Sequence, residues 1–334
     1  MTKTVLLVTW SGDTSGIVQS MQRLLADRGV RGLRFDTDRF PTEEQARLVY
    51  DGATEALQLR DGEAWRTLGP DDAIWYRRAR WAGKLPMTMD KQLRHGCVIE
   101  SETFLRGLMA AAPCFVMDPP ELVRQNGHKP LQLKVARELG LATPRTLITN
   151  EPGAAHAFVK SCPHGAVAKM LSAFPIMDEA GEEQVVFTTA LAEEHLEKLE
   201  GLRYHPMVFQ ERLQKALELR VTVVGRQIFA AAVDSQAQPG AEVDWRERGV
   251  SLLRSWRPYT LPAQLEEQLG RYMTATGMQY SAIDIIVEPD GRHVFLEANP
   301  AGECFWLEYN SPHFPLAQSL VDVLLDAPGA RRTR

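Results

Sequence analysis

The alternation of apolar and polar positions divides the first third of the chain into short strands and helices. Val5–Trp10 is a β-rich apolar run that ends at Ser11-Gly12-Asp13, and helical spacing follows from Thr14 to Asp27. Asp61-Gly62 stands between two alternating segments, which indicates a hairpin. The same reasoning predicts strands at Gly32–Phe35, Ala73–Tyr76 and Phe115–Met117, and helices at Met89–Ala111 and Pro120–Leu139.

After Gly140 and Pro144 the pattern changes to a small β-rich region and then to longer strands. Strands are predicted at Thr146–Thr149, Val167–Met170, Val185–Thr188, Met207–Leu213, Arg220–Val224 and Gln227–Val233. Helices at Pro262–Thr276 and Pro315–Leu325 flank a hairpin within Ala282–Ala298. We therefore expect an α/β (α+β) protein with three lobes, formed by residues 1–120, 121–190 and 191–330.

Composition narrows the function classes. With 334 residues, 44% hydrophobic and 24% charged, the chain can build more than one ordinary core. A net charge of −5 gives no basic field, which argues against nucleic acid as a partner. Its four cysteines form no metal or disulfide spacing, and the N-terminal apolar run is too short for a signal peptide or membrane span. These features predict a cytoplasmic protein with reduced thiols.

The segment Ser281–Pro300 carries the most specific chemical pattern. If Pro289 faces Arg292 across the turn, Asp284 falls directly opposite Glu297, and Asn299 lies on the same face one pleat further on. Two carboxylates and an amide then converge.

Both faces of this hairpin are otherwise apolar, which indicates burial. On this register Ile286 and Phe295 share one face; the other face holds Ile285, Val287, Val294 and Leu296. Opposed carboxylates in a buried sheet need a positive partner, and Mg²⁺ prefers such oxygen ligands. The alternative is a carboxylate pair that shares a proton or caps a neighbouring element.

Two lysines and one polar strand segment add weaker signals. Lys169 lies within an apolar strand, where it would either meet an anion such as phosphate or reach solvent from the sheet edge. Lys129 near a helix start could reach a nucleotide or be an ordinary surface side chain. At Phe209–Leu213, where polar residues interrupt an apolar strand, strand-edge backbone groups can read an adenine edge, and further along Glu218 can bind ribose and Arg220 phosphate. The competing interpretation is a surface ion pair between Glu218 and Arg220 or Lys215.

The order of these features resembles the ATP-grasp superfamily, and within it the microviridin-type, or graspetide, ligases that close rings in ribosomally made peptides. The likeness covers nearly the whole chain. It is carried by Val5–Trp10, Trp75–Arg78, Lys129 with Gln132, Leu133 and Ala136, Gly140–Asn150, Phe187–Thr189, Asp244–Arg246 and Phe295–Gly302.

The resemblance implies an ADP-forming ligase that uses ATP and Mg²⁺ and acts on a ribosomal precursor peptide with a leader and a core. The implied nucleotide contacts are Lys129, Lys169, Gln210, Glu211, Arg212, Leu213 and Glu218. Arg220 and Arg246 are the implied phosphate or acyl-phosphate contacts, and Asp284, Glu297 and Asn299 the implied Mg²⁺ ligands. Arg77 and Arg78 are candidates for pairing with an acidic leader, and a homodimer is a further possibility.

The chain departs from the family pattern at two places. Ser172–Pro175 lacks a glycine-rich phosphate cover, and Glu303-Cys304 follows Gly302 where a Gln and an aromatic are expected. Two other functions stay open at this point: a ligase that joins amino acids or adds them to a protein tail, and a nucleotide-binding regulatory module without turnover.

Overall fold

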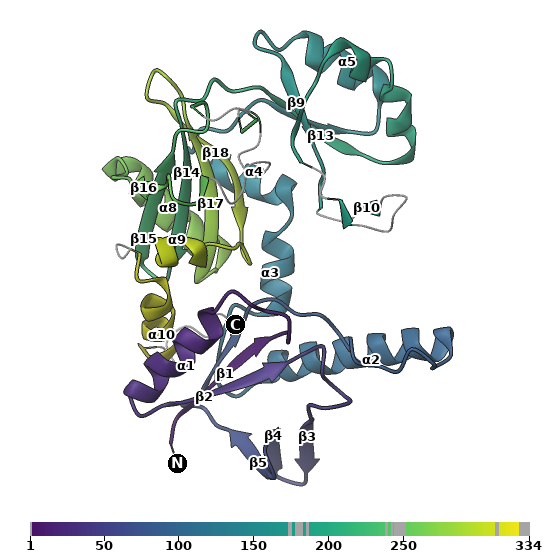
Figure 1. Cartoon of the computed structure of the whole chain (residues 1–334), viewed down its shortest axis with the longest axis vertical. Coiled ribbons are helices and arrows are strands. Elements are labelled where there is room, and N and C mark those ends of the chain that lie inside the picture. The colour runs from purple at the N-terminus through teal and green to yellow at the C-terminus, as the bar shows by residue number, and fades with distance from the viewer. Residues whose placement is uncertain are drawn as a thin grey trace.

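The computed structural model describes residues 2–172, 176–177, 183–184, 187–237, 240–241, 243, 252–310 and 314–326. Three lobes are visible in Figure 1: an N-terminal lobe at the bottom, a central lobe at the upper right and a C-terminal lobe at the upper left. This arrangement confirms the predicted α/β class with several sheets.

The N-terminal lobe is built on a parallel sheet of order β2-β1-β6-β7. Its strands are β1 (Thr4–Thr9), β2 (Arg31–Asp36), β6 (Ala73–Tyr76) and β7 (Phe115–Met117), and its helices are α1 (Ile17–Asp27) and α2 (Lys91–Ala110). Every residue of β1 is buried, because alternate side chains enter two different cores. Val5 and Leu7 pack in the core that holds α1, whereas Leu6 and Val8 pack with Leu105 of α2.

A small antiparallel sheet extends this lobe. It consists of β3 (Ala46–Asp51), β4 (Thr54–Asp61) and β5 (Ala64–Leu68). The predicted hairpin is confirmed, since Asp61 pairs with Ala64 and Gly62 has the positive φ of 62° that such a turn requires. Strand β3 was not predicted, because none of its side chains is fully buried and it shows little apolar alternation.

The predicted helix Pro120–Leu139 is in fact two helices, α3 (Pro120–Asn126) and α4 (Lys129–Glu138). Pro130 explains the break, because proline lacks an N–H and is tolerated in the first turn of a helix but not in its interior, and α4 has it in the first turn. Ala136 of α4 lies in the core of the C-terminal lobe, so these helices pack with that lobe although the sequence placed them with the central one.

The central lobe is an antiparallel sheet of order β12-β9-β13-β8, covered by helices. Its elements are β8 (Thr146–Thr149), α5 (Pro152–Lys160), β9 (Ala166–Lys169), β12 (Thr189–Ala190), α6 (Glu193–Leu196), a 3₁₀ helix (Leu199–Tyr204) and β13 (Met207–Glu211). A separate two-stranded ribbon is formed by β10 (Ile176–Met177) and β11 (Glu183–Gln184). The predicted strand Val185–Thr188 lies partly outside the described residues.

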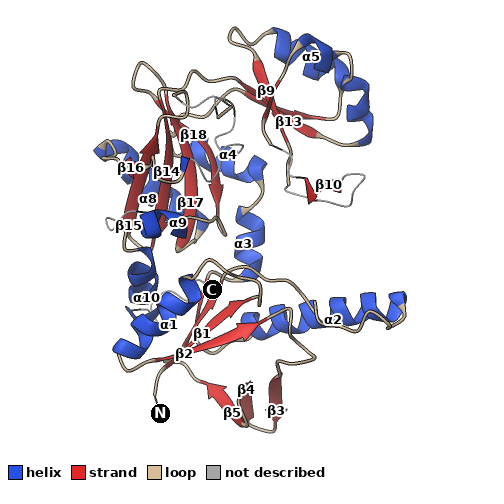
Figure 2. Cartoon of the chain, viewed as in Figure 1, coloured by secondary structure: helices blue, strands red, loops and turns tan. Residues whose placement is uncertain are grey.

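The C-terminal lobe holds a five-stranded antiparallel sheet of order β16-β15-β14-β17-β18. Its elements are β14 (Leu217–Val224), β15 (Gln227–Val233), β16 (Arg257–Pro258), α8 (Ala263–Thr276), β17 (Tyr280–Val287), β18 (His293–Asn299), α9 (Phe305–Asn310) and α10 (Leu316–Asp326). Figure 2 shows α8 against one face of this sheet and α10 between the sheet and the N-terminal lobe. Leu320 and Val321 of α10 share a core with Val5 and Leu7, so the two lobes are joined by apolar packing.

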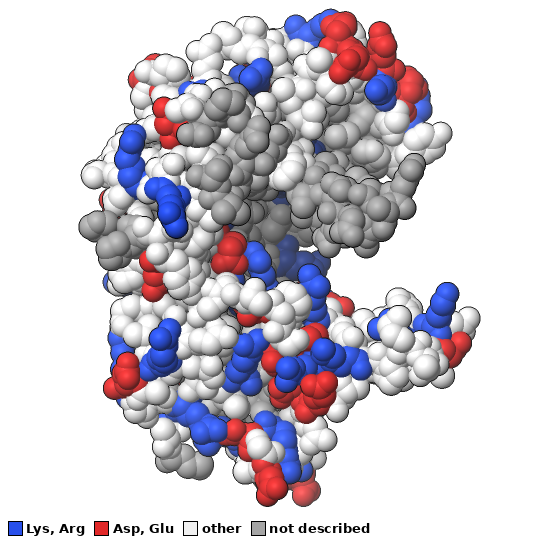
Figure 3. Space-filling model, viewed as in Figure 1, with Lys and Arg blue, Asp and Glu red and all other residues white. Residues whose placement is uncertain are grey.

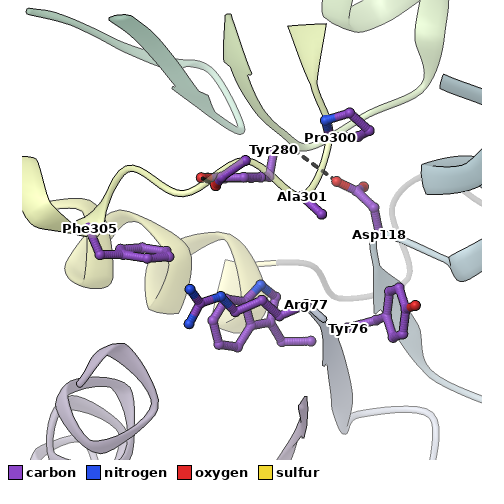
Figure 4. A pocket seen from close by; sticks show the side chains of 9 residues that line it. Tyr76, Arg77, Asp118, Tyr280, Pro300, Ala301 and Phe305 are labelled. Carbon is purple, nitrogen blue, oxygen red and sulfur yellow. Dashed lines mark hydrogen bonds between the residues drawn. The ribbon is translucent and has the colours of Figure 1, made fainter. Parts of the chain in front are cut away.

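Asp118 joins the same two lobes through hydrogen bonds. It follows β7 and is buried, and its carboxylate accepts hydrogen bonds from the backbone N–H groups of Gln279 and Tyr280 at 2.9 Å each. Figure 4 shows its bond to the Tyr280 segment beside a small pocket at this junction. The start of β17 is thus positioned from the N-terminal lobe.

No helix in the described part of the chain has the length and apolar character needed to cross a membrane.

Replacement of Asp118 by Ala should destabilise the protein by about 3 kcal/mol, because two buried N–H groups lose their acceptor. Urea unfolding followed by circular dichroism measures this. Asp290→Ala is the matched control, since Asp290 also accepts a backbone N–H, from Arg292 at 2.9 Å, but in an exposed turn. Equal losses in both variants would contradict the role given to Asp118.

Candidate active site

The β17–β18 hairpin brings the predicted acidic pair together. Asp284 pairs with Glu297 and Ala282 with Asn299, as predicted. The predicted turn was wrong by one residue, because Glu288 faces Arg292 where Pro289 was expected to: the N–H of Glu288 bonds to the carbonyl of Arg292. A β-bulge between Asp284 and Ile285 inserts one extra residue on the partner strand and restores the register beyond it.

The bulge also exchanges two side chains between the faces of β18. Phe295, predicted to share a face with Ile286, instead packs against Tyr272 of α8 with a ring separation of 5.3 Å. Leu296, predicted on the opposite face, lines the cleft together with Ile286. The two acidic residues and these two apolar side chains therefore line the same cleft.

This cleft has a volume of about 1320 Å³ and is lined by all three lobes. Figure 3 shows the molecule hollowed between the central and N-terminal lobes. The sequence-predicted residues that line it are Arg78, Lys129, Lys169, Gln210, Glu211, Arg212, Leu213, Glu218, Arg220, Asp284, Glu297 and Asn299. Arg246 lies outside the described residues.

Two cations face the acidic pair. Lys129, at the start of α4, donates to Oε2 of Glu297, and Nη1 of Arg220 donates to Oδ1 of Asp284 at 2.7 Å. The Asn299 amide donates to Oδ2 of Asp284 at 3.0 Å. Burial alone would lower the pKa of Arg220, but the carboxylate of Asp284 raises it above its usual value. Each carboxylate thus has its own counter-charge.

The acid, acid, amide set fits Mg²⁺ that is also held by phosphate oxygens. Two opposed carboxylates supply hard oxygen donors, and the amide of Asn299 can offer its oxygen by turning about its terminal bond. Within the described residues, no cluster of three or more His, Cys, Asp or Glu could hold a metal by itself.

The segment from Gln210 to Leu213 leaves the central sheet and enters the cleft. Gln210 is buried in β13 and donates to the hydroxyl of Thr146 at 3.1 Å. The N–H of Glu211 bonds to the carbonyl of Arg145, and the N–H of Arg212 to that of Gly165. Lys169 ends the neighbouring strand β9, with Val208 as its register partner.

Glu218 lies deeper in the cleft, at the start of β14. Its side chain accepts a hydrogen bond from Nζ of Lys215 at 2.9 Å, and the same amine donates to the carbonyl of Val243 at 2.8 Å. Burial raises the pKa of Glu218, although Lys215 acts against this shift. A buried acid with one charged partner can still accept hydrogen bonds from ligand hydroxyls.

The two arginines predicted to bind a peptide occupy different places. Arg78 lines the cleft and is about half exposed, and that prediction stays open for it. Arg77 is 7% exposed, and its guanidinium is paired with Asp13 and Glu303 inside the protein. A leader peptide therefore does not reach Arg77 in this structure, and Arg77 is part of the lobe junction.

Three residues that support the site had no role assigned to them from the sequence. Gln132 of α4 bonds with its side-chain amide to both the N–H and the carbonyl of Ala298, which fixes β18 between Glu297 and Asn299. Gly302 turns back over the strand end, with its N–H bonded to the carbonyl of Asn299. Glu303 supplies the carbonyl that accepts from Arg220. Such contacts join distant segments, so a local pattern does not reveal them.

A methyl group at residue 302 would lie 2.7 Å from Cβ of Ala282 and 2.8 Å from Cβ of Asn299. Gly302→Ala should therefore destabilise the protein by about 1–3 kcal/mol, as overpacking does. Gly270→Ala in α8 is the control, because nothing lies within 4 Å of its added methyl group and alanine favours a helix. Urea unfolding should move in opposite directions for the two variants; a stabilised Gly302→Ala protein would show that the site tolerates the methyl group.

Comparison with known proteins agrees with this geometry. The family model described as MvdD pre-ATP grasp domain matches residues 4–124. No curated protein sequence matches the chain. The described fold superimposes on macrocyclase MdnC from Microcystis aeruginosa MRC, bound with its precursor peptide MdnA, with a TM-score of 0.87. The two sequences are 43% identical over 97% of this chain and 99% of that one.

Two further structures are similar over the same extent. A RiPP-associated ATP-grasp ligase from Chryseobacterium gregarium, in complex with ADP and a leader and core peptide, has a TM-score of 0.91 and 31% identity over 97% of both chains. Macrocyclase MdnB from Microcystis aeruginosa MRC has a TM-score of 0.77 and 35% identity over 97% of this chain and 99% of that one. The chain belongs to the graspetide-type ATP-grasp ligases, the family of the peptide macrocyclases.

Proposed function

We propose that this protein activates side-chain carboxyl groups of a ribosomal precursor peptide with ATP and closes intramolecular rings. The observation that carries the proposal is the opposed pair of Asp284 and Glu297, faced by Lys129 and Arg220 in a cleft that also receives the Gln210–Leu213 segment. A carboxylate pair with two counter-cations is an arrangement suited to phosphoryl transfer.

The nucleotide is proposed to lie between the central and C-terminal lobes. Ile286 and Leu296 offer apolar contact to a base, and the end of β13 offers backbone groups for its edge. Glu218 would accept hydrogen bonds from the ribose hydroxyls, and Lys169 would meet the phosphates. ADP is bound by the Chryseobacterium gregarium relative, which supports a nucleotide site in this chain.

Asp284, Glu297 and Asn299 would hold Mg²⁺. When bound, the ion neutralises phosphate charge and helps to orient the transferring group. Lys129 and Arg220 are placed to neutralise the remaining negative charge, since each already contacts one of the carboxylates. Arg246 is proposed as a further contact to the phosphate or acyl phosphate.

The proposed reaction has two steps. An Asp or Glu side chain of the peptide attacks the γ-phosphorus of ATP, which forms an acyl phosphate and releases ADP. The hydroxyl of a Thr or Ser, or the amine of a Lys, then attacks the acyl carbon; phosphate leaves and the attacking group loses its proton. Each ring closure therefore removes one water from the peptide. The protein's part is to position the reacting groups and to stabilise the charge that develops.

The acceptor end of the cleft is proposed to bind the core of the peptide. Arg78 comes from the N-terminal lobe and lines the cleft, as does Trp306 of α9. An exposed arginine can pair with the carboxylate of an acidic substrate. The MdnC and Chryseobacterium gregarium structures contain precursor peptides, which supports a peptide as the partner.

Intact-mass spectrometry tests this function. A candidate precursor, a short peptide rich in Thr, Ser, Asp and Glu, is incubated with the protein, ATP and Mg²⁺ while ADP is measured. We expect loss of one water per ring, and Glu297→Gln should slow it by about a hundredfold or more because a transition-state contact is lost.

Glu288→Gln is the matched control, because Glu288 lies in the same hairpin and pairs only locally with Arg292 in the structure. It should keep wild-type turnover. ADP formed without dehydration of any peptide would instead favour a ligase that joins amino acids, and no ADP with any acceptor would favour a binding module.

A further inference from the structure

A line of polar contacts runs from the N-terminal lobe to the proposed metal ligands. Nη1 of Arg77 donates to Asp13 at 2.7 Å, and Nη2 donates to Oε2 of Glu303 at 2.5 Å. Figure 4 shows Arg77 reaching from the end of β6 toward Phe305, and its guanidinium lies 4.9 Å from that ring. Arg77 therefore holds the segment that follows Gly302.

Glu303 continues this line into the cleft. Its carbonyl accepts from Nη2 of Arg220 at 2.6 Å, while Nη1 of the same guanidinium donates to Asp284 at 2.7 Å. Arg220 is 8% exposed, so it cannot easily exchange these bonds for water. Its orientation toward Asp284 depends on where the Glu303 carbonyl lies.

The side chain of Glu303 fastens the same residue to the N-terminal lobe. Oε2 binds Arg77 at 2.5 Å and lies 3.4 Å from Nη1 of Arg78, so one carboxylate bridges two arginines of the N-terminal lobe. The Arg77 side chain is 6% exposed. A buried guanidinium leaves its partner reluctantly, because separation would leave an uncompensated charge.

The resemblance led us to expect a neutral Gln after Gly302, where this chain has Glu303. A glutamine could keep a hydrogen bond to Arg77 but not the ion pair. The connection described here thus depends on the carboxylate of Glu303.

We propose that Glu303 is a positioning residue that couples the N-terminal lobe to the metal ligand Asp284 through its ion pair with Arg77 and its carbonyl bond to Arg220. This inference rests on the proposed function, because it assigns Asp284 to Mg²⁺. Loss of the ion pair would free the segment after Gly302, and Arg220 would then orient Asp284 less well. Metal affinity falls when a residue that orients a metal ligand is lost.

The test is the affinity of the full-length protein for ADP, measured by calorimetry with and without Mg²⁺. Glu303→Gln should weaken binding in the presence of Mg²⁺ by about tenfold, the lower end of the range for outer partners of metal ligands. Binding of ADP without Mg²⁺ should change much less. An unchanged Mg²⁺-dependent gain in affinity would overturn the proposal.

Asp322→Asn is the matched control. Asp322 of α10 pairs with Arg28 at 2.7 Å and so also joins the C-terminal elements to the N-terminal lobe, but it is not part of the line to Arg220. It should leave ADP binding at the wild-type level under both conditions. An equal loss in this variant would show that any weakening of the lobe junction has the same effect.

A double-mutant cycle separates positioning from general structural damage. In the Asp284→Asn background, Glu303→Gln should have no further effect on the Mg²⁺-dependent gain, because the oriented ligand is already changed. If the two substitutions instead cause additive losses of the Mg²⁺-dependent gain, Glu303 and Asp284 are not coupled and the proposal is overturned. Arg77→Lys keeps the charge but replaces the two nitrogens that hold Asp13 and Glu303 by a single amine. It should reproduce the Glu303→Gln effect, and so serves as the test if the Glu303→Gln protein folds poorly.

These outcomes are independent of the peptide reaction. If the wild-type protein binds ADP with Mg²⁺ but dehydrates no peptide, the proposed function fails while the role of Glu303 is still measured. If the wild-type protein binds ADP with the same affinity with and without Mg²⁺, the assignment of Asp284 to Mg²⁺ fails and the inference fails with it.

Discussion

The opposition of Asp284 and Glu297 on neighbouring strands is the constraint on which the site depends. Like charges facing each other in a largely buried sheet are unfavourable, so the fold must bring positive groups to them. It does so from two directions, with Lys129 at the start of α4 and Arg220 on β14. The break between α3 and α4 has a function in this view, because it places Lys129 at a helix start that faces the hairpin.

The same hairpin shows which features of the site could be predicted from the sequence and which could not. The Asp284–Glu297 pairing was predicted from a turn that is displaced by one residue, and a bulge of one residue compensates the displacement. Alternation predicts which residues face each other only while the ladder is regular. The exchange of Phe295 and Leu296 between faces followed from the bulge, and no local pattern signalled it.

Strongly apolar elements were predictable for a physical reason. Most of β6 and the second half of β15 are buried, so the composition of these strands is constrained, and their predicted bounds match the structure. Burial does not constrain the composition of half-exposed β3, nor the choice of the residues that pair with Arg77. The pair Arg77-Arg78 looks uniform in sequence, yet tertiary packing buries the first and exposes the second. Charge placement of this kind is decided by contacts between lobes.

The lobe junction explains why the site should respond to the N-terminal lobe at all. Apolar packing of α10 against β1 and α1 holds the two lobes together, but apolar contacts are not directional and do not orient the side chains of the site. Hydrogen bonds have direction: those of Asp118 position the start of β17, and those of Glu303 position the guanidinium beside Asp284. A change in how the N-terminal lobe holds Asp118 therefore acts on β17, which carries the proposed metal ligand Asp284. A change at Arg77 acts on the same residue through the guanidinium of Arg220, which contacts its carboxylate.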